Sequence, residues 1–169
     1  MIKETLSELD FYHGNVKLPK GISLDMESFR ADILYYSSTD KPFPMSRNLD
    51  ILHAYISDYF NLNFVRHLII RDTFGLIIPP NEQTPTIVEA DPMDLINAPD
   101  YVMLYGVKVK EESCPVTIEF DDKRQKNRWY KRQLKTNSFM IFPSTLTYKI
   151  EKNESSDTNY IMKCTYESK

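Results

Sequence analysis

Hydrophobic positions in the first part of the chain recur at steps of three and four, the period of a helix that packs on one side. The first series follows an aspartate that can cap a helix: Asp25, then Met26, Phe29 and Ile33. The second series follows a serine that can do the same: Ser46, then Leu49, Leu52, Ile56 and Tyr59. Prolines in residues 39–44 break the helical ladder between them. The pattern predicts two helices.

After residue 63 the period changes to the alternation of half-buried strands. The predicted strands are residues 64–78, 86–89, 101–110, 116–120, 128–134, 139–142, 146–150 and 158–166. Gly75 is expected to interrupt the first of them, residues 91–95 to form one helical turn, and residues 121–127 a polar turn. Short strands at near-regular spacing after two helices predict an α+β, mainly β fold, a jelly roll or sandwich with an N-terminal helical layer.

The chain of 169 residues fits a single domain. We expect an extended arm in residues 1–22, the helical layer in residues 23–62 and a β-rich core in residues 63–169. A net charge of -3 excludes a general coat of basic residues for nucleic acid. Cys114 and Cys164 lack metal-ligand spacing and are expected to be buried thiols. Neither a signal peptide nor an apolar run of about 20 residues is present, so secretion and membrane insertion are not expected.

The most informative motif is Phe142-Pro143-Ser144 followed by Tyr148, within the run of strands. With this motif, residues 101–166 resemble the C-terminal half of the iron- and 2-oxoglutarate-dependent oxygenases, especially the small prolyl-hydroxylase-like members. The resemblance implies a double-stranded β-helix. In that family the tripeptide precedes the second metal-binding histidine, and Tyr148 falls on that position. Asn159 falls near the basic residue that pairs with 2-oxoglutarate, with Lys163 further along the same strand.

The family's first metal motif, His-x-Asp, corresponds to Glu89-Ala90-Asp91, which keeps a carboxylate and lacks the histidine. Iron catalysis in the family needs two histidines and one carboxylate. The three histidines here, His13, His53 and His67, all precede the strand-rich half. A phenol ligates well only after losing a proton near pH 10. The degenerate metal and co-substrate positions are therefore Glu89, Asp91, Tyr148 and Asn159, and we expect no catalytic residue, metal or cofactor.

A second resemblance concerns the two ends of the sequence, residues 6–14 (LSELDFYHG) and 160–167 (YIMKCTYE). They are similar to small uncharacterised proteins of marine tailed bacteriophages. In such genomes oxygenase-like folds occur both as enzymes and as parts of the virion. The resemblance implies a role in the host cytoplasm during assembly and then in the virion.

Cations and aromatic residues alternate around the polar turn. The candidate partner-binding residues are Lys123, Arg124, Lys126, Arg128, Trp129, Lys131 and Arg132. Such a hairpin suits an acidic groove of a protein partner. It also suits phosphate contact with base stacking, or a solvated sheet edge whose charges prevent aggregation.

Together these features predict a non-catalytic oxygenase-like protein that acts in protein binding and assembly, in the neck, tail or baseplate of a tailed phage. We expect protein subunits, virion proteins among them, as partners in an oligomer or complex, and neither nucleic acid nor membrane. The alternative is a divergent hydroxylase that uses Fe(II) and 2-oxoglutarate. It would need Glu89, Asp91 and a histidine borrowed from elsewhere.

Overall fold

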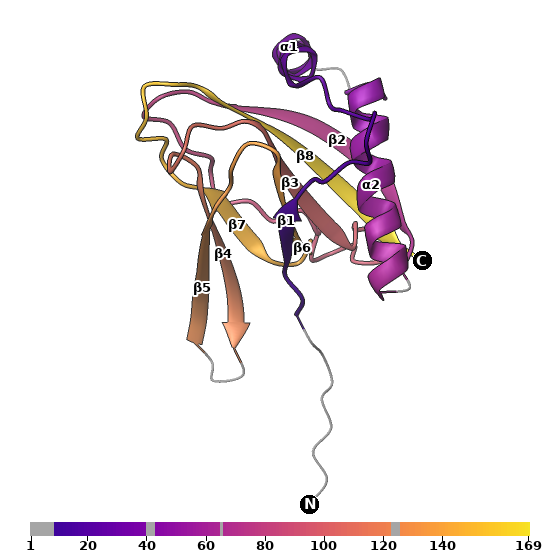
Figure 1. Ribbon diagram of the computed structural model, residues 1–169. Coiled ribbons are helices and arrows are strands. Elements are labelled where there is room, and N and C mark those ends of the chain that lie inside the picture. The colour runs from indigo at the N-terminus through magenta and orange to yellow at the C-terminus, as the bar shows by residue number, and fades with distance from the viewer. Residues whose placement is uncertain (1–8, 40–42, 65, 123–125) are drawn as a thin grey trace, which may run out of the picture.

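Two β-sheets face each other, and two helices cover the outer side of the larger sheet (Figure 1). The computed structural model describes residues 9–39, 43–64, 66–122 and 126–169, with the backbone alone for residues 121, 122, 126 and 127. Its elements are β1 (Tyr12–Asn15), α1 (Met26–Ser37), α2 (Arg47–Phe64), β2 (Leu68–Ile78), β3 (Tyr101–Lys108), β4 (Pro115–Asp122), β5 (Lys126–Gln133), β6 (Ser138–Pro143), β7 (Thr147–Ile150) and β8 (Asn159–Ser168).

The larger sheet has five strands in the order β1-β6-β3-β8-β2, and the smaller has three in the order β5-β4-β7. Every pairing within them is antiparallel. An isolated bridge between Ile87 and Tyr148 adds the chain segment before β3 to the open edge of β7. This arrangement confirms the predicted jelly-roll architecture with an N-terminal layer of two helices.

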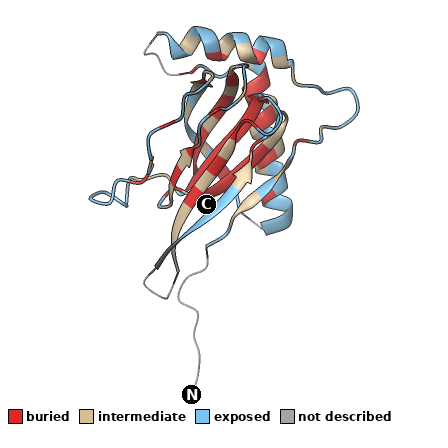
Figure 2. Cartoon of the chain, turned by 90° about the vertical axis from the view of Figure 1, so that its left-hand side faces the viewer, coloured by how far each residue is buried: buried red, intermediate tan, exposed pale blue. Residues whose placement is uncertain are grey.

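Alternation along each strand of the larger sheet divides the core into two layers. On β8, Met162, Cys164 and Tyr166 pack toward the helices, whereas Ile161 lies between the two sheets. Figure 2 shows the buried residues concentrated in the strands and on one side of each helix.

Both helices begin at the predicted caps. The Asp25 side chain accepts a hydrogen bond from the Ser28 backbone N–H at 3.0 Å. The Ser46 hydroxyl accepts one from the Leu49 backbone N–H at 3.3 Å. These contacts satisfy N–H groups that a helix start leaves without an internal partner.

Gly75 does not interrupt β2, contrary to the sequence-based prediction. The strand runs through it, and its register shift lies between Ile70 and Asp72. A Cβ atom at position 75 would lie 2.8 Å from Ile33 Cγ2 of α1. Gly75 therefore allows a close approach of helix to sheet rather than a bend in the strand.

Two other local predictions need correction. Residues 91–95 form turns, with the Asp94 N–H donating to the Asp91 carbonyl at 3.0 Å, and no helical turn. The polar turn is shorter than residues 121–127, because β4 and β5 extend into it. Within the described part of the N-terminal arm, β1 pairs with β6 of its own chain.

The two cysteines are free and buried, as the sequence predicted. Burial raises the pKa of both the Cys114 and the Cys164 thiol to about 12. Among the described residues, neither helix combines the length and hydrophobicity that a membrane span requires.

Candidate functional site

A carboxylate, a phenol and an ammonium group meet between the two sheets. Tyr148 Oη donates a hydrogen bond to Glu89 Oε1 at 2.7 Å. Lys163 Nζ donates to the same oxygen, also at 2.7 Å. The three side chains come from the segment before β3, from β7 and from β8 respectively. We call Glu89, Tyr148 and Lys163 the interior triad.

The backbone places Glu89 through the bridge at Ile87. Ile87 and Tyr148 exchange two backbone hydrogen bonds of 2.8 Å each. Glu89 lies two residues beyond Ile87, and the Ala90 N–H is held by the Ser144 carbonyl at 3.2 Å. The Phe-Pro-Ser motif therefore contributes through its serine, whose backbone fixes the segment that carries Glu89.

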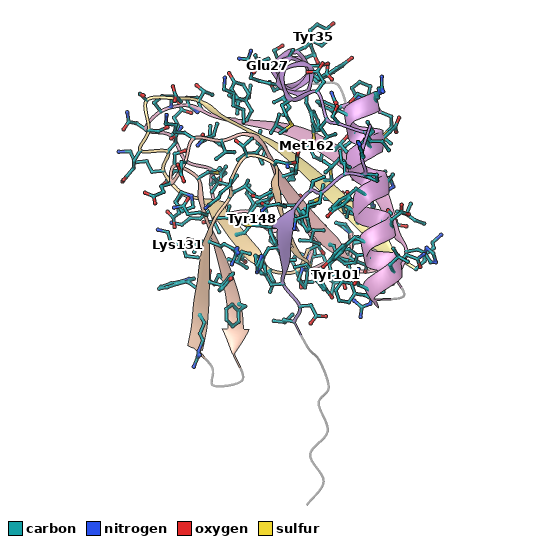
Figure 3. All side chains as sticks on the ribbon, viewed as in Figure 1. Glu27, Tyr35, Tyr101, Lys131, Tyr148 and Met162 are labelled. Atoms are coloured by element: carbon teal, nitrogen blue, oxygen red, sulfur yellow. The ribbon has the colours of Figure 1, made fainter. Side chains whose placement is uncertain are left out.

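Tyr148 is 1% exposed and is one of the largest fully buried side chains. Burial, followed by the charge of Glu89 and its hydrogen bond, raises the pKa of the Tyr148 phenol far above its ordinary value of 10.0. The phenol consequently stays protonated and acts as a hydrogen-bond donor. Figure 3 labels Tyr148 between the two sheets.

Lys163 reaches the triad from the inner face of β8. Its ammonium lies 4.6 Å from the centroid of the Phe74 ring, a cation–π contact from β2. The Lys163 and Glu89 side chains are 12% and 14% exposed. A charge pair this enclosed is weakly screened by water, so each partner depends on the other.

Aromatic rings fill the interior beside the triad. Phe142 makes an edge contact with Tyr148, with ring centroids 5.1 Å apart. Phe11 of the N-terminal arm stacks on Phe142 at 6.4 Å and meets Tyr130 of β5 at 4.9 Å. The arm thus inserts a ring between the sheets, a contact that the sequence pattern did not reveal.

Two of the four positions to which the resemblance pointed lie apart from the triad. Asp91 is exposed, and its carboxylate accepts a hydrogen bond from the Met93 backbone N–H at 2.8 Å. Asn159 is fully buried, accepting from the Lys110 N–H at 2.9 Å and bonding Ser113. Lys163, rather than Asn159, brings the basic group to Glu89. The sequence feature that could have identified Lys163 is its position in the strand. Lys163 alternates with residues that face the helices, so its side chain points to the opposite, inner side of the sheet.

These donors do not fit Fe(II). The triad supplies one carboxylate, a phenol held in its protonated form, and an ammonium 2.7 Å from the carboxylate oxygen, where its charge opposes a cation. His53 lies on the other side of the larger sheet, with its ring 5.6 Å from that of Tyr166. Among the described residues, no group of three or more His, Cys, Asp or Glu is arranged to hold a metal.

The basic hairpin is divided between the two faces of the smaller sheet. Trp129 and Lys131 pair across to Glu119 and Thr117 and face outward, where Figure 3 labels Lys131. Arg128 and Arg132 alternate with them and share the side of Tyr130, to which Arg132 donates at 3.3 Å. Lys123 and Arg124 lie outside the described residues, as does the side chain of Lys126.

Comparison of this fold with solved structures finds the same architecture in oxygenases. A prolyl-4-hydroxylase from Pseudomonas putida matches with a TM-score of 0.62 and 9% identity, over 93% of this chain and 84% of the other. The α-ketoglutarate-dependent epimerase SnoN from nogalamycin biosynthesis matches with a TM-score of 0.66 and 10% identity, over 92% and 76%. HygX from Streptomyces hygroscopicus, solved with nickel and 2-oxoglutarate, matches with a TM-score of 0.63 and 9% identity, over 93% and 82%.

These similarities establish the fold. The chain has the jelly roll of the 2-oxoglutarate- and iron-dependent oxygenases, as its C-terminal motif implied. No protein-family model matches the sequence, and no curated protein matches it either. At about 10% sequence identity, a shared fold does not imply a shared reaction. The function depends on the residues of the site.

Proposed function

We propose that this chain is a non-catalytic protein of oxygenase fold that works in protein binding and assembly. The observation that carries the proposal is the interior triad. Glu89 is bound by both Tyr148 and Lys163 on one oxygen, so the one carboxylate there is already neutralised by the protein itself. A pocket whose charge is balanced internally has no need of a cation to complete it.

Exposed apolar side chains support the binding part of the proposal. In the loop between Glu89 and β3, Met93, Leu95 and Ile96 are 92%, 59% and 96% exposed. Asp91 precedes Met93, and Asp94 lies between Met93 and Leu95. Contiguous exposed apolar side chains with a polar rim are typical of protein contacts. The acidic flanks favour a partner with an apolar pocket and a basic border.

The resemblance of the sequence to proteins of tailed phages supplies the setting of the proposal, namely the neck, tail or baseplate of a virion. Its partners would be virion proteins. The chain would therefore be part of an oligomer or a larger complex rather than a monomer. Mass spectrometry of purified particles tests this setting. Absence of the chain from particles, together with a purified chain that stays monomeric and binds no virion protein, would contradict it.

The non-catalytic part is tested by metal analysis and turnover. The chain, purified and incubated with Fe(II), 2-oxoglutarate and oxygen, is expected to retain no stoichiometric iron and to form no succinate above the protein-free rate. Iron retained in wild type and in Glu27→Ala but lost in Glu89→Ala would overturn the proposal. Glu27 is the matched control, because it pairs with Arg30 on exposed α1.

The alternative function is a divergent hydroxylase dependent on Fe(II) and 2-oxoglutarate, and the shared fold is the observation that favours it. It would require Lys163 to leave Glu89 and pair with the co-substrate carboxylate. It would also require a histidine to approach Glu89 from outside the interior. The turnover assay separates the two functions, because this one demands succinate in step with oxygen use.

A further inference from the structure

The outer face of the smaller sheet carries a hollow of about 460 Å³ around the only tryptophan of the chain. The Trp129 side chain is 72% exposed, unlike most large aromatic residues in this fold. The hollow lies on β4, β5 and β7, and the side chains of Glu119, Trp129 and Lys131 in its lining alternate along their strands with side chains that face the interior. Its volume falls in the range of small-ligand sites.

Strand register places the polar lining beside the indole. Glu119 is directly opposite Trp129, and Thr117 is directly opposite both Lys131 and Lys149. Residues directly opposite in neighbouring strands share a face. The ring is therefore surrounded by carboxylate, hydroxyl and ammonium groups on a rigid sheet rather than on loops.

The charges of this lining balance. Glu119 and Glu151 contribute two negative charges, and Lys131 and Lys149 contribute two positive charges, so their formal sum is zero. Glu151 accepts from Thr117 Oγ1 at 2.8 Å and pairs with Lys149 Nζ at 3.2 Å. A face with no net charge gives no general attraction to phosphate, which disfavours a nucleic acid here.

We propose that this hollow binds a neutral carbohydrate, with a pyranose ring stacked on Trp129. A pyranose has an apolar face of C–H groups that packs on an aromatic ring, and an edge of hydroxyl groups. Each hydroxyl both donates and accepts, which matches carboxylate acceptors and ammonium donors in one lining.

A protein partner matches this face less well. The buried centre of a protein interface is apolar and poor in charged residues. Here one indole stands among charged and hydroxyl side chains. The exposed apolar loop at Met93 and Ile96 has the composition that a protein contact requires, so the two surfaces suit different ligands.

This site goes beyond the assembly role and does not depend on it, since it lies across the sheet from Glu89 and needs no statement about iron. The chain offers a direct probe, because all indole fluorescence comes from Trp129. The experiment titrates the full chain with neutral oligosaccharides of glucose, galactose, mannose and N-acetylglucosamine, and follows indole emission and binding heat.

The expected result is a saturable emission change with at least one of these sugars, with a Kd between about 10 μM and 10 mM. Trp129→Ala is expected to weaken binding, measured by calorimetry, at least roughly tenfold. Trp129→Phe should retain part of the affinity, because it keeps an aromatic face. Tyr35→Ala is the matched control, an aromatic residue 63% exposed on α1, and should bind like wild type.

Three outcomes would overturn the proposal. The first is the absence of a saturable response to any of the sugars up to about 100 mM, roughly ten times the weakest expected Kd. The second is equal affinity in wild type and in a Trp129→Ala variant whose circular dichroism is unchanged. The third is a response to a single-stranded oligonucleotide that exceeds the response to every sugar, which would assign the face to nucleic acid instead.

Discussion

The two faces of the smaller sheet carry the same kinds of groups with opposite consequences. Against the inner face, Tyr148 of β7 and Lys163 of β8 both donate to Glu89, and the three side chains are nearly closed to water. On the outer face, Trp129 stands exposed among carboxylates and ammonium groups that line a hollow. The difference teaches that polar groups which satisfy one another and polar groups available to a ligand lie on different sides of one sheet.

The strongest test of the inner face is to remove its carboxylate. Glu89→Ala leaves the Lys163 ammonium enclosed without its partner, and we expect unfolding free energy, measured in urea, to fall by about 3 kcal/mol or more. Glu89→Leu combined with Lys163→Met should recover much of that loss, because it removes both charges.

The matched control for that change is the exposed pair Glu27–Arg30 on α1, whose side chains are 70% and 32% exposed. Glu27→Ala should cost less than about 0.5 kcal/mol. Equal losses in Glu89→Ala and Glu27→Ala would mean that the interior triad is as open to water as the exposed pair on α1.

The second largest effect is expected at alkaline pH, where the unfolding free energy should fall because buried groups between the two sheets titrate. The folded-state pKa values of Tyr148 and Cys114 are raised above the ordinary values of 10.0 and 9.0, so the unfolded chain releases these protons first. Their stabilising contribution is complete below those values. It is lost as pH rises, between 9.0 and about 12 for Cys114 and from 10.0 upward for Tyr148.

Each such group lowers the unfolding free energy by about 1.4 kcal/mol per pH unit within its window. Urea unfolding between pH 8 and pH 11 measures the slope. In Tyr148→Phe the unfolding free energy should fall less steeply above pH 10.0 than in wild type. The difference in slope should be up to about 1.4 kcal/mol per pH unit, because one titrating group has been removed. A slope identical to that of wild type would show that this phenol is open to solvent.

At neutral pH, Tyr148→Phe should have a smaller effect. It removes one hydrogen bond to an enclosed carboxylate while keeping the ring packed on Phe142, and we expect a loss of about 1–3 kcal/mol in urea unfolding. A loss below about 0.3 kcal/mol would contradict the bond as a stabilising contact.

The outer face should give the smallest effect. Trp129→Ala removes an exposed ring, so its unfolding free energy should stay within about 0.5 kcal/mol of wild type. A larger loss of unfolding free energy would mean that Trp129 stabilises the sheet. Its role would then be structural rather than the binding of a ligand.

The sequence predicted the architecture well because its hydrophobic periods are clear. Capping residues and apolar spacing marked both helices, and alternation marked the strands. The prediction that Gly75 interrupts a strand was wrong, because a glycine in a strand can mark either a bend or a close approach of a neighbouring element. Only the position of Ile33, which is distant in sequence, decides between them.

The interior triad was predictable in part. The resemblance pointed to Glu89 and Tyr148, whereas it placed Asn159 near the basic position and Lys163 only further along the same strand. Spacing alone fails there because the connection between β7 and β8 sets which residue reaches the interior. The division of the basic hairpin between two faces was visible in its alternation, but the hollow depends on cross-strand neighbours that no local pattern reveals.

The position of β8 also constrains how this protein is made. β8 lies between β3 and β2, so the larger sheet stays in two pieces until residues 159–168 have left the ribosome. Until then β2 and β3 each present an open edge, the kind of surface that invites mispairing between nascent chains. A translational pause before residues 159–168 should therefore lower the soluble yield.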